Sequence, residues 1–179
     1  MRDGAAAAAV TRYPATIRWL HRIIALLMIF MIALGWYLSE MEYEHPDKAM
    51  LLQLHRTIGL SLFPLGLAHL WAYAYLPRPA FSAHLQPWEK TLAKLAHFFL
   101  LYVVIAIPVA GYLMSGDKLL VLGDTAVPQL LELNKGLRKT LFGVHETLAW
   151  IAAFVIGLHV VGALKHHFID KDDTLRKML

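Results

Sequence analysis

The 179-residue chain contains no cysteine. This absence excludes disulfide bonds, thiolate zinc sites, iron–sulfur clusters and the covalent attachment of c-type haem, because all of these need cysteine sulfur. The ten histidines are then the softest ligands that the chain can offer to a transition metal. Any metal centre is therefore expected to depend on imidazole nitrogen.

Charged residues are scarce at 17% of the chain, whereas hydrophobic residues make up 58%. Soluble domains are about 45–50% apolar, so contact with lipid explains the excess. Four apolar segments, each of about 20 residues or more, can each cross a bilayer, and they cover approximately residues 19–38, 51–75, 92–114 and 141–164. We predict an all-α fold, an integral membrane four-helix bundle, as one domain over residues 1–179.

Carboxylates are almost missing from these segments, which contain Glu146 alone. Paired-carboxylate chemistry within the membrane is thereby excluded, and the chain has no Gly-rich phosphate loop and no nucleophile elbow. The sequence identifies no catalytic residue. The first apolar segment lacks a small-residue cleavage site after it, so we expect it to be retained rather than removed as a signal peptide.

Basic residues are distributed unevenly between the two sides of the predicted bundle. Eleven of the 17 Lys and Arg residues fall on the side of the two termini, and six fall on the other side. Positive residues favour the cytoplasmic side, so we predict that both termini of this multi-pass membrane protein are cytoplasmic. The net charge of +4 then reflects orientation and does not indicate nucleic acid. Residues 5–9, all alanine, are expected to be a disordered tail.

Two of the apolar segments each carry a pair of histidines fourteen residues apart: His55 with His69, and His145 with His159. Fourteen residues rise by about 21 Å and return to within about 40° of the same helix face. Each helix thus presents two imidazoles on one side, near opposite edges of an apolar layer roughly 30 Å thick. This pattern predicts two flat metal cofactors stacked across the membrane, and electron transfer between its faces.

A cofactor held by two imidazoles needs histidines at the same depth on neighbouring helices. Near the outer edge, only His55 and His145 meet this condition within the segments. The inner edge is crowded, with six histidines: His21, His69, His97, His159, His166 and His167. We expect His159 to be a ligand because it shares a face with His145. Its partner stays open, because symmetry favours His69 and depth allows His21. Interhelical hydrogen bonding is the alternative role for any single histidine, but it does not explain the sorting by depth.

Glycines stand near three of these histidines, at positions 59, 66, 157 and 162. Missing side chains would make room for a planar porphyrin, although small residues serve ordinary helix packing equally well.

The histidine-bearing segments resemble the bacterial four-helix cytochrome b561 family of the inner membrane. The similarity is strongest over residues 144–149, 156–159 and 163–168, and is supported by residues 54–59 and 95–97. It implies two non-covalent haems b, one held by His21 and His159 and one by His55 and His145. It therefore favours His21 over His69. Relatives can carry arginine at the position of His69, so His69 stays a candidate partner of a haem propionate or an alternative ligand.

The same resemblance implies electron exchange with ubiquinone, with His166 as a partner of a quinone carbonyl. Some relatives look like superoxide oxidases, which convert periplasmic superoxide to oxygen and reduce ubiquinone. Such chemistry needs an electropositive entrance on the outer face, but the outer loops carry charges of both signs. Residues 39–48 contain four carboxylates and one lysine. Residues 115–140 carry Lys118, Lys135, Arg138 and Lys139 against Asp117, Asp124 and Glu132.

Two other functions stay open. The first is a quinol-linked relay to or from a periplasmic redox protein docked on the outer loops, without superoxide chemistry. The second is a haem-binding subunit of a larger dehydrogenase. Membrane lipid is an expected partner in each case, and a homo-oligomer also stays open.

Overall fold

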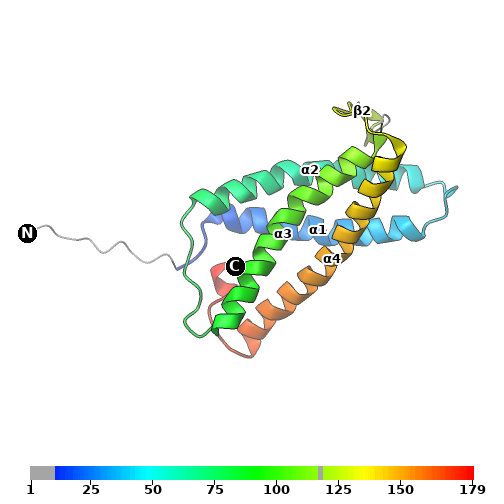
Figure 1. The fold of residues 1–179 in the computed structure, drawn as a ribbon. Coiled ribbons are helices and arrows are strands. Elements are labelled where there is room, and N and C mark those ends of the chain that lie inside the picture. Colours follow the sequence, from blue (N-terminus) through cyan, green and yellow to red (C-terminus); the bar gives the residue numbers. More distant parts are fainter. Residues whose placement is uncertain (1–10, 117–118) are drawn as a thin grey trace, which may run out of the picture.

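The computed structural model describes residues 11–116 and 119–179. Four long helices form a bundle: α1 (Ala15–Glu40), α2 (Lys48–Tyr75), α3 (Pro87–Met114) and α4 (Lys135–Phe168) (Figure 1). A two-stranded antiparallel hairpin, β1 (Leu119–Val121) and β2 (Thr125–Val127), connects α3 to α4, and a 3-10 helix, η2 (Leu175–Lys177), ends the chain. Each long helix is long and apolar enough to cross a membrane. The prediction of an all-α membrane bundle is confirmed.

Helices α3 and α4 begin before the apolar segments because polar caps form their starts. Helix α3 begins at Pro87, where Gln86 and Glu89 form a capping box. Helix α4 begins at Lys135, where the side chain of Asn134 accepts the backbone N–H of Leu137. The predicted boundaries of residues 92 and 141 were therefore too late.

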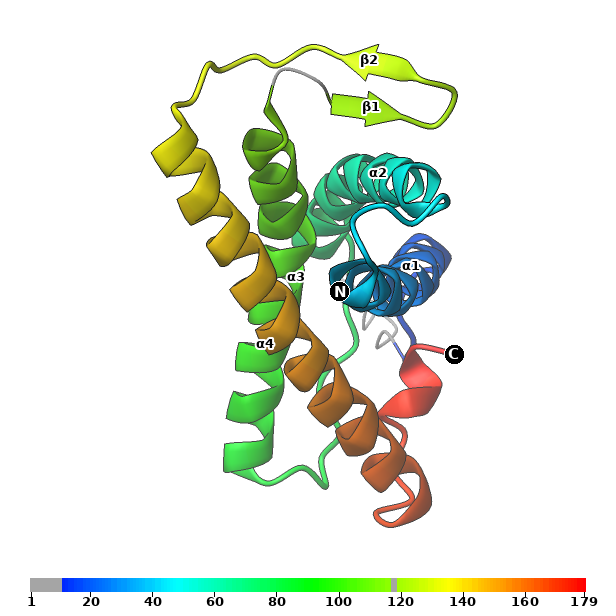
Figure 2. The same ribbon diagram turned by 90° about the vertical axis from the view of Figure 1, so that its right-hand side faces the viewer.

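Packing runs in sequence order around the bundle, since α1 contacts α2, α2 contacts α3, and α3 contacts α4. Helix α4 makes little close backbone contact with α1, and in Figure 2 it crosses the bundle obliquely. Helices α2 and α3 approach each other closely at Gly66, where an added Cβ would lie 2.8 Å from Cγ1 of Val104.

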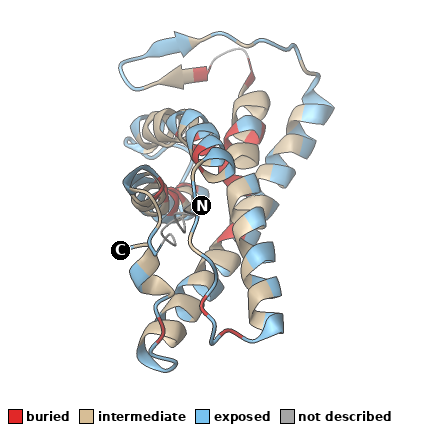
Figure 3. Ribbon diagram, turned by 90° about the vertical axis from the view of Figure 1, so that its left-hand side faces the viewer, coloured by how far each residue is buried: buried red, intermediate tan, exposed pale blue. Residues whose placement is uncertain are grey.

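The apolar core is a small cluster of buried residues, and much of the rest of the helix surface is half-buried or exposed (Figure 3). Its buried residues come from all four helices: Ile24, Met28, Met31, Leu62, Val103, Val104 and Ala152. Along the chain, Leu62 lies midway between His55 and His69, and Ala152 midway between His145 and His159. The core therefore separates two levels of histidines.

The hairpin packs on α2. The backbone N–H of Leu122 donates to Oγ1 of Thr57 at 2.9 Å, and Gln53 donates to Oδ1 of Asp124 at 2.7 Å. Gln53 and Thr57 lie two residues before and after His55, about 200° around the helix. The hairpin thus contacts the face of α2 opposite to His55. Within the hairpin, β1 packs on α2, and Leu119 is 2% exposed, while Leu130 further on is 81% exposed.

The start of α1 and the C-terminus lie at one end of the bundle, here called the terminal end; the opposite end, with β1 and β2, is the hairpin end (Figure 1). The last residues fold back against the start of α1. The N–H of Tyr13 donates to the carbonyl of Lys177 at 3.0 Å, and Arg18 donates to the carbonyl of Leu179. The predicted disorder of residues 5–9 falls outside the described residues, as do Asp117 and Lys118 of the predicted outer mouth.

Candidate functional site

At the hairpin end, His55 of α2 and His145 of α4 face each other with ring centroids 6.2 Å apart. Nδ1 of His145 lies 3.0 Å from the carbonyl oxygen of Ile107 on α3. A carbonyl only accepts hydrogen bonds, so this nitrogen carries the proton, and Nε2 is left with its lone pair. A hydrogen bond of this kind orients an imidazole for metal binding.

Two glycines lie against these rings. A Cβ added at Gly35 of α1 would come 3.2 Å from Cε1 of His55, and a Cβ at Gly111 of α3 would come 3.2 Å from both Cε1 and Nδ1 of His145. Such distances are shorter than normal contacts between carbon atoms. Each imidazole therefore occupies space that only a glycine on the neighbouring helix leaves open.

At the terminal end, four imidazoles come together from all four helices. His21 of α1 lies 6.2 Å from His159 of α4 and 6.5 Å from His69 of α2, measured between ring centroids. His97 of α3 lies closer to His159, at 5.3 Å. The sequence placed all four at this edge, but it did not single out His97 as a neighbour of His159.

These distances can be compared with the geometry of a metal ion between two imidazoles. A metal–nitrogen bond of about 2.0 Å, with about 1.2 Å from nitrogen to ring centre on each side, separates the centroids by about 6.4 Å. His55 with His145 and His21 with His159 both fit this value. The contact of His97 with His159 is about 1 Å too short for opposite sides of a metal. The rings present thus fit two bis-imidazole centres.

His69 has a suitable distance to His21, but among the described aromatic side chains it has no ring contact with His159. A centre using His69 would therefore pair it with His21 and leave out His159. In such a centre α4 would supply no ligand at the terminal end. Pairing His21 with His159 instead lets α4 supply one imidazole at each end of the bundle.

His166 lies beyond this cluster, at the end of α4, in a network of ion pairs. Its Nδ1 is 2.8 Å from Oδ2 of Asp170 and 3.2 Å from Oδ2 of Asp172. The ammonium of Lys165 lies 2.8 Å from Asp170 and 2.7 Å from Oε1 of Glu89 on α3. The hydrogen bond from Lys165 is the main cause that lowers the pKa of Asp170 below its ordinary value.

Glu89, His166 and Asp170 bring three potential metal ligands within 4.8 Å of one another. Lys165 already forms ion pairs with both carboxylates of this group. Its ammonium provides the positive charge that a metal ion would bring. We therefore assign no metal to these three residues.

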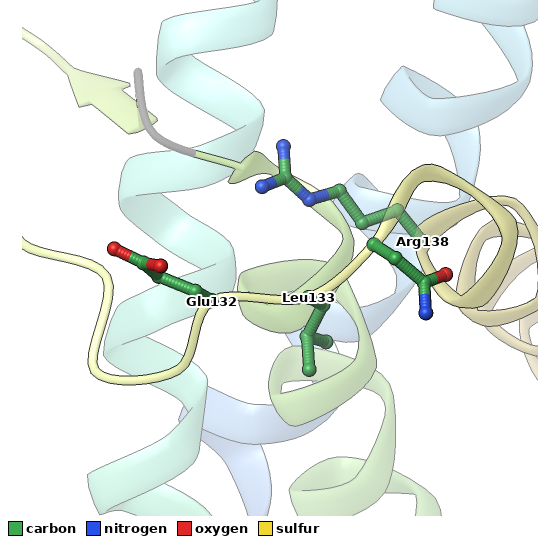
Figure 4. A pocket seen from close by; sticks show the side chains of 4 residues that line it. Glu132, Leu133 and Arg138 are labelled. Carbon is green, nitrogen blue, oxygen red and sulfur yellow. The ribbon is translucent and has the colours of Figure 1, made fainter.

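An open pocket of about 400 Å³ lies at the hairpin end, where α4 begins (Figure 4). It is lined by Glu132, Leu133, Asn134 and Arg138. The lining combines one acidic and one basic side chain, as the mixed charge of this loop predicted. The pocket is therefore not a uniformly positive site for an anion.

The glycines that contact imidazoles are not those that the sequence singled out. Gly66 leaves room for the side chain of Val104, and a Cβ added at Gly59 would lie 3.5 Å from Cε of Met31. A Cβ added at Gly157 or at Gly162 would meet nothing within 4 Å. Gly35 and Gly111 were missed as neighbours of the histidines because they belong to other helices. Proximity in sequence, on which the prediction relied, does not report contacts between helices.

Comparison with known proteins gives consistent matches. The family model described as prokaryotic cytochrome b561 matches residues 12–179. Cytochrome b561 homolog 2 of Escherichia coli K12 is 34% identical over 164 residues, covering 89% of this chain and 86% of the relative. The probable superoxide oxidase CybB of Yersinia pestis is 27% identical, covering 86% and 89%. Cytochrome b561 homolog 1 of Escherichia coli K12 is 26% identical, covering 95% and 98%.

Proposed function

The chain belongs to the prokaryotic cytochrome b561 family, and from this premise we propose that it is a two-haem protein that oxidises superoxide at one membrane face and reduces ubiquinone at the other. Membership makes it a haem-binding electron-transport protein with several spans in the bacterial inner membrane. The number of haems, their ligands and the two reactants are the proposal.

We assign one haem b to His55 and His145 and the other to His21 and His159. The observation that carries this assignment is the equal separation of 6.2 Å in both pairs, which fits a metal ion between two imidazoles. When bound, haem b supplies one-electron chemistry at iron. The protein contributes the ligands, the proton on Nδ1 of His145, the space left by two glycines and the apolar layer between the levels. His69 is then a candidate partner of a haem propionate at the terminal end.

Ubiquinone is assigned to the terminal end, near His166. This histidine lies seven residues after His159, about two helical turns away and close to the same face of α4. Its side chain is 13% exposed and borders the charged network of Lys165 and Asp170. An imidazole at this place can exchange a hydrogen bond and a proton with a quinone carbonyl.

Superoxide is assigned to the hairpin end, with both termini cytoplasmic as the distribution of basic residues predicts. Support comes from the relative named as a probable superoxide oxidase, which aligns over most of both chains. The mixed charge at this end, with Glu132 beside Arg138, gives weaker electrostatic attraction for an anion than a uniformly basic mouth would.

A second candidate is electron exchange with a periplasmic redox protein. The feature that favours it is the extended surface at the hairpin end, where Tyr43 is 91% and Leu130 81% exposed. Exposed aromatic and aliphatic side chains among mixed charges are typical of a protein-docking surface.

Reduction of the purified haem-loaded protein by enzymatically generated superoxide distinguishes these functions. At low ionic strength, we expect the haem α-band to appear faster with superoxide than in a matched sample containing superoxide dismutase. Equal rates in the two samples would exclude the oxidase. Reduction by a quinol in the same preparation tests the ubiquinone assignment independently.

A further inference from the structure

Asp172 is a buried carboxylate beside His166 that the proposed function has not used. Its side chain is 1% exposed, and its Oδ2 lies 3.2 Å from Nδ1 of His166. Its Oδ1 accepts the backbone N–H of Thr174 at 2.8 Å. Within residues 11–116 and 119–179, its one ion pair is with this histidine. A carboxylate withdrawn from water is stabilised by a partner that can carry positive charge, and among the described residues His166 is the one at ion-pair distance from it.

The charges around His166 come from three elements. Glu89 belongs to α3, Lys165 to α4, and Asp170 and Asp172 to the tail after α4. Three carboxylates thus surround one ammonium group and one imidazole. His166 therefore lies among carboxylates from two elements, with the ammonium of Lys165 paired to two of them.

The contacts also decide which ring nitrogen is available. Nδ1 lies 2.8 Å from Oδ2 of Asp170 and 3.2 Å from Oδ2 of Asp172. These are ion-pair distances without an aligned hydrogen bond, and they place both carboxylates on the Nδ1 side of the ring. Nε2, on the other side of the ring, is the nitrogen left for a ligand. This division is the one that a carboxylate imposes on a histidine in general acid–base catalysis.

We propose that Asp172 is a positioning residue that, with Asp170, holds His166 as the group that exchanges protons with the quinone; the inference rests on the proposed function. Reduction of a quinone to the quinol takes two electrons, one from each of two ferrous haems, and two protons, one for each carbonyl oxygen. One proton would pass from Nε2 of His166 to the carbonyl oxygen that it contacts, and water beside Asp170, whose side chain is 28% exposed, would supply the other and restore the first. In the reverse direction, oxidation of the quinol would return one proton to Nε2 and one to water, and two electrons to two ferric haems.

The test uses Asp172→Asn, which removes the charge but can keep the hydrogen bond from Thr174. Asp173→Asn is the matched control, because this neighbouring carboxylate is 58% exposed and pairs with Lys177 at 3.0 Å, away from His166. Haem-loaded protein is mixed with a short-chain ubiquinol across the neutral pH range, in water and in deuterium oxide, and haem reduction is followed by stopped flow. Haem content and reduction by dithionite are measured in parallel.

We expect Asp172→Asn to slow reduction by quinol about tenfold or more, the scale of general acid–base catalysis, and to change its pH profile. Dithionite reduction and haem content should match the wild type, Asp173→Asn should behave as wild type, and Asp172→Glu should recover part of the rate. Equal rates and pH profiles in Asp172→Asn and the wild type overturn the inference alone. So does a uniform loss at every pH accompanied by a lower melting temperature, because that indicates a structural role. Failure of any quinol to reduce the wild type overturns the ubiquinone assignment itself.

Discussion

Gly111 on α3 lies directly against the imidazole of His145 on α4, so that a Cβ at this glycine would come 3.2 Å from two atoms of the ring. The ring cannot move freely, because its Nδ1 is bonded to the carbonyl of Ile107 on the same α3 helix. The position of one proposed iron ligand therefore depends on a missing side chain on the helix beside it.

A larger residue at position 111 should displace His145. We expect Gly111→Val to lose about half of the bound haem, since one of two bis-histidine centres fails while the other stays intact. Gly143→Val is the matched control, because a Cβ at Gly143 meets nothing within 4 Å. Haem content per polypeptide is measured by the pyridine haemochrome spectrum. Full haem content in Gly111→Val would show that the contact does not position a ligand.

Replacing single histidines tests the ligand assignment. We expect His21→Ala and His55→Ala each to lower haem content by about half, because each breaks one bis-imidazole centre. His69→Ala should keep both haems and alter only the redox potential of one, as expected for a partner of a propionate. Loss of one haem in His69→Ala but not in His21→Ala would reverse the assignment at the terminal end.

The two histidine levels could be predicted because the spacing of His145 and His159 lies within one helix, where periodicity alone decides which side chains share a face. The proximity of Gly35 to His55, and of His97 to His159, could not. Those contacts depend on how neighbouring helices rotate and cross, and similar apolar surfaces all around a membrane helix carry little information about its rotation.

The hairpin and the tail were missed for a different reason. Strands β1 and β2 have three residues each, too short for an alternating pattern, although Gly123 and Asp124 at the turn have positive φ values of 77° and 54°. The sequence of residues 170–179 shows only that the tail is rich in charged residues. Burial of Asp172 depends on a fold-back onto α4, for which a short charged segment gives no periodic signal.

The absence of cysteine allows orientation to be tested with single substitutions. We predict that Tyr43→Cys, in the loop between α1 and α2 where Tyr43 is 91% exposed, reacts with a membrane-impermeant maleimide in intact spheroplasts. Lys171→Cys, in the tail, should react only after lysis, because both termini are predicted to be cytoplasmic. The opposite labelling pattern would invert the orientation and exchange the faces assigned to ubiquinone and superoxide.

Attachment of the hairpin to α2 should be separable from haem binding. Thr57→Val removes the acceptor for the N–H of Leu122, which should weaken the local attachment by about 1 kcal/mol. Faster amide hydrogen exchange at Leu122 would show this. The haem spectrum should not change, since Thr57 lies on the face of α2 opposite to His55. Loss of haem in this variant would instead mean that the hairpin supports the haem pocket.

Docking of the tail should depend on pH through Asp170. Its pKa is lowered in the folded protein, first by the hydrogen bond from Lys165. The ionised form is thus favoured by folding, and its contribution is complete above the unfolded pKa of about 3.9. The contribution is lost as the pH falls through the lower, folded pKa. A hydrogen bond from Lys177 lowers the pKa of Asp173 in the same way. Protonation of Asp173 in acid therefore also removes a stabilising contribution.

We therefore expect the tail to detach in acid while the apolar bundle stays folded. The N–H of Tyr13, which donates to the carbonyl of Lys177, reports this step by hydrogen exchange corrected for the intrinsic effect of pH. Its protection should fall below about pH 4, while that of amides in the core around Val103 should not. Asp170→Asn should show the weaker protection already at neutral pH, because Lys165 then loses one of its two carboxylate partners. Unchanged protection of Tyr13 in acid and in the variant would show that the backbone contacts of the tail suffice to hold it.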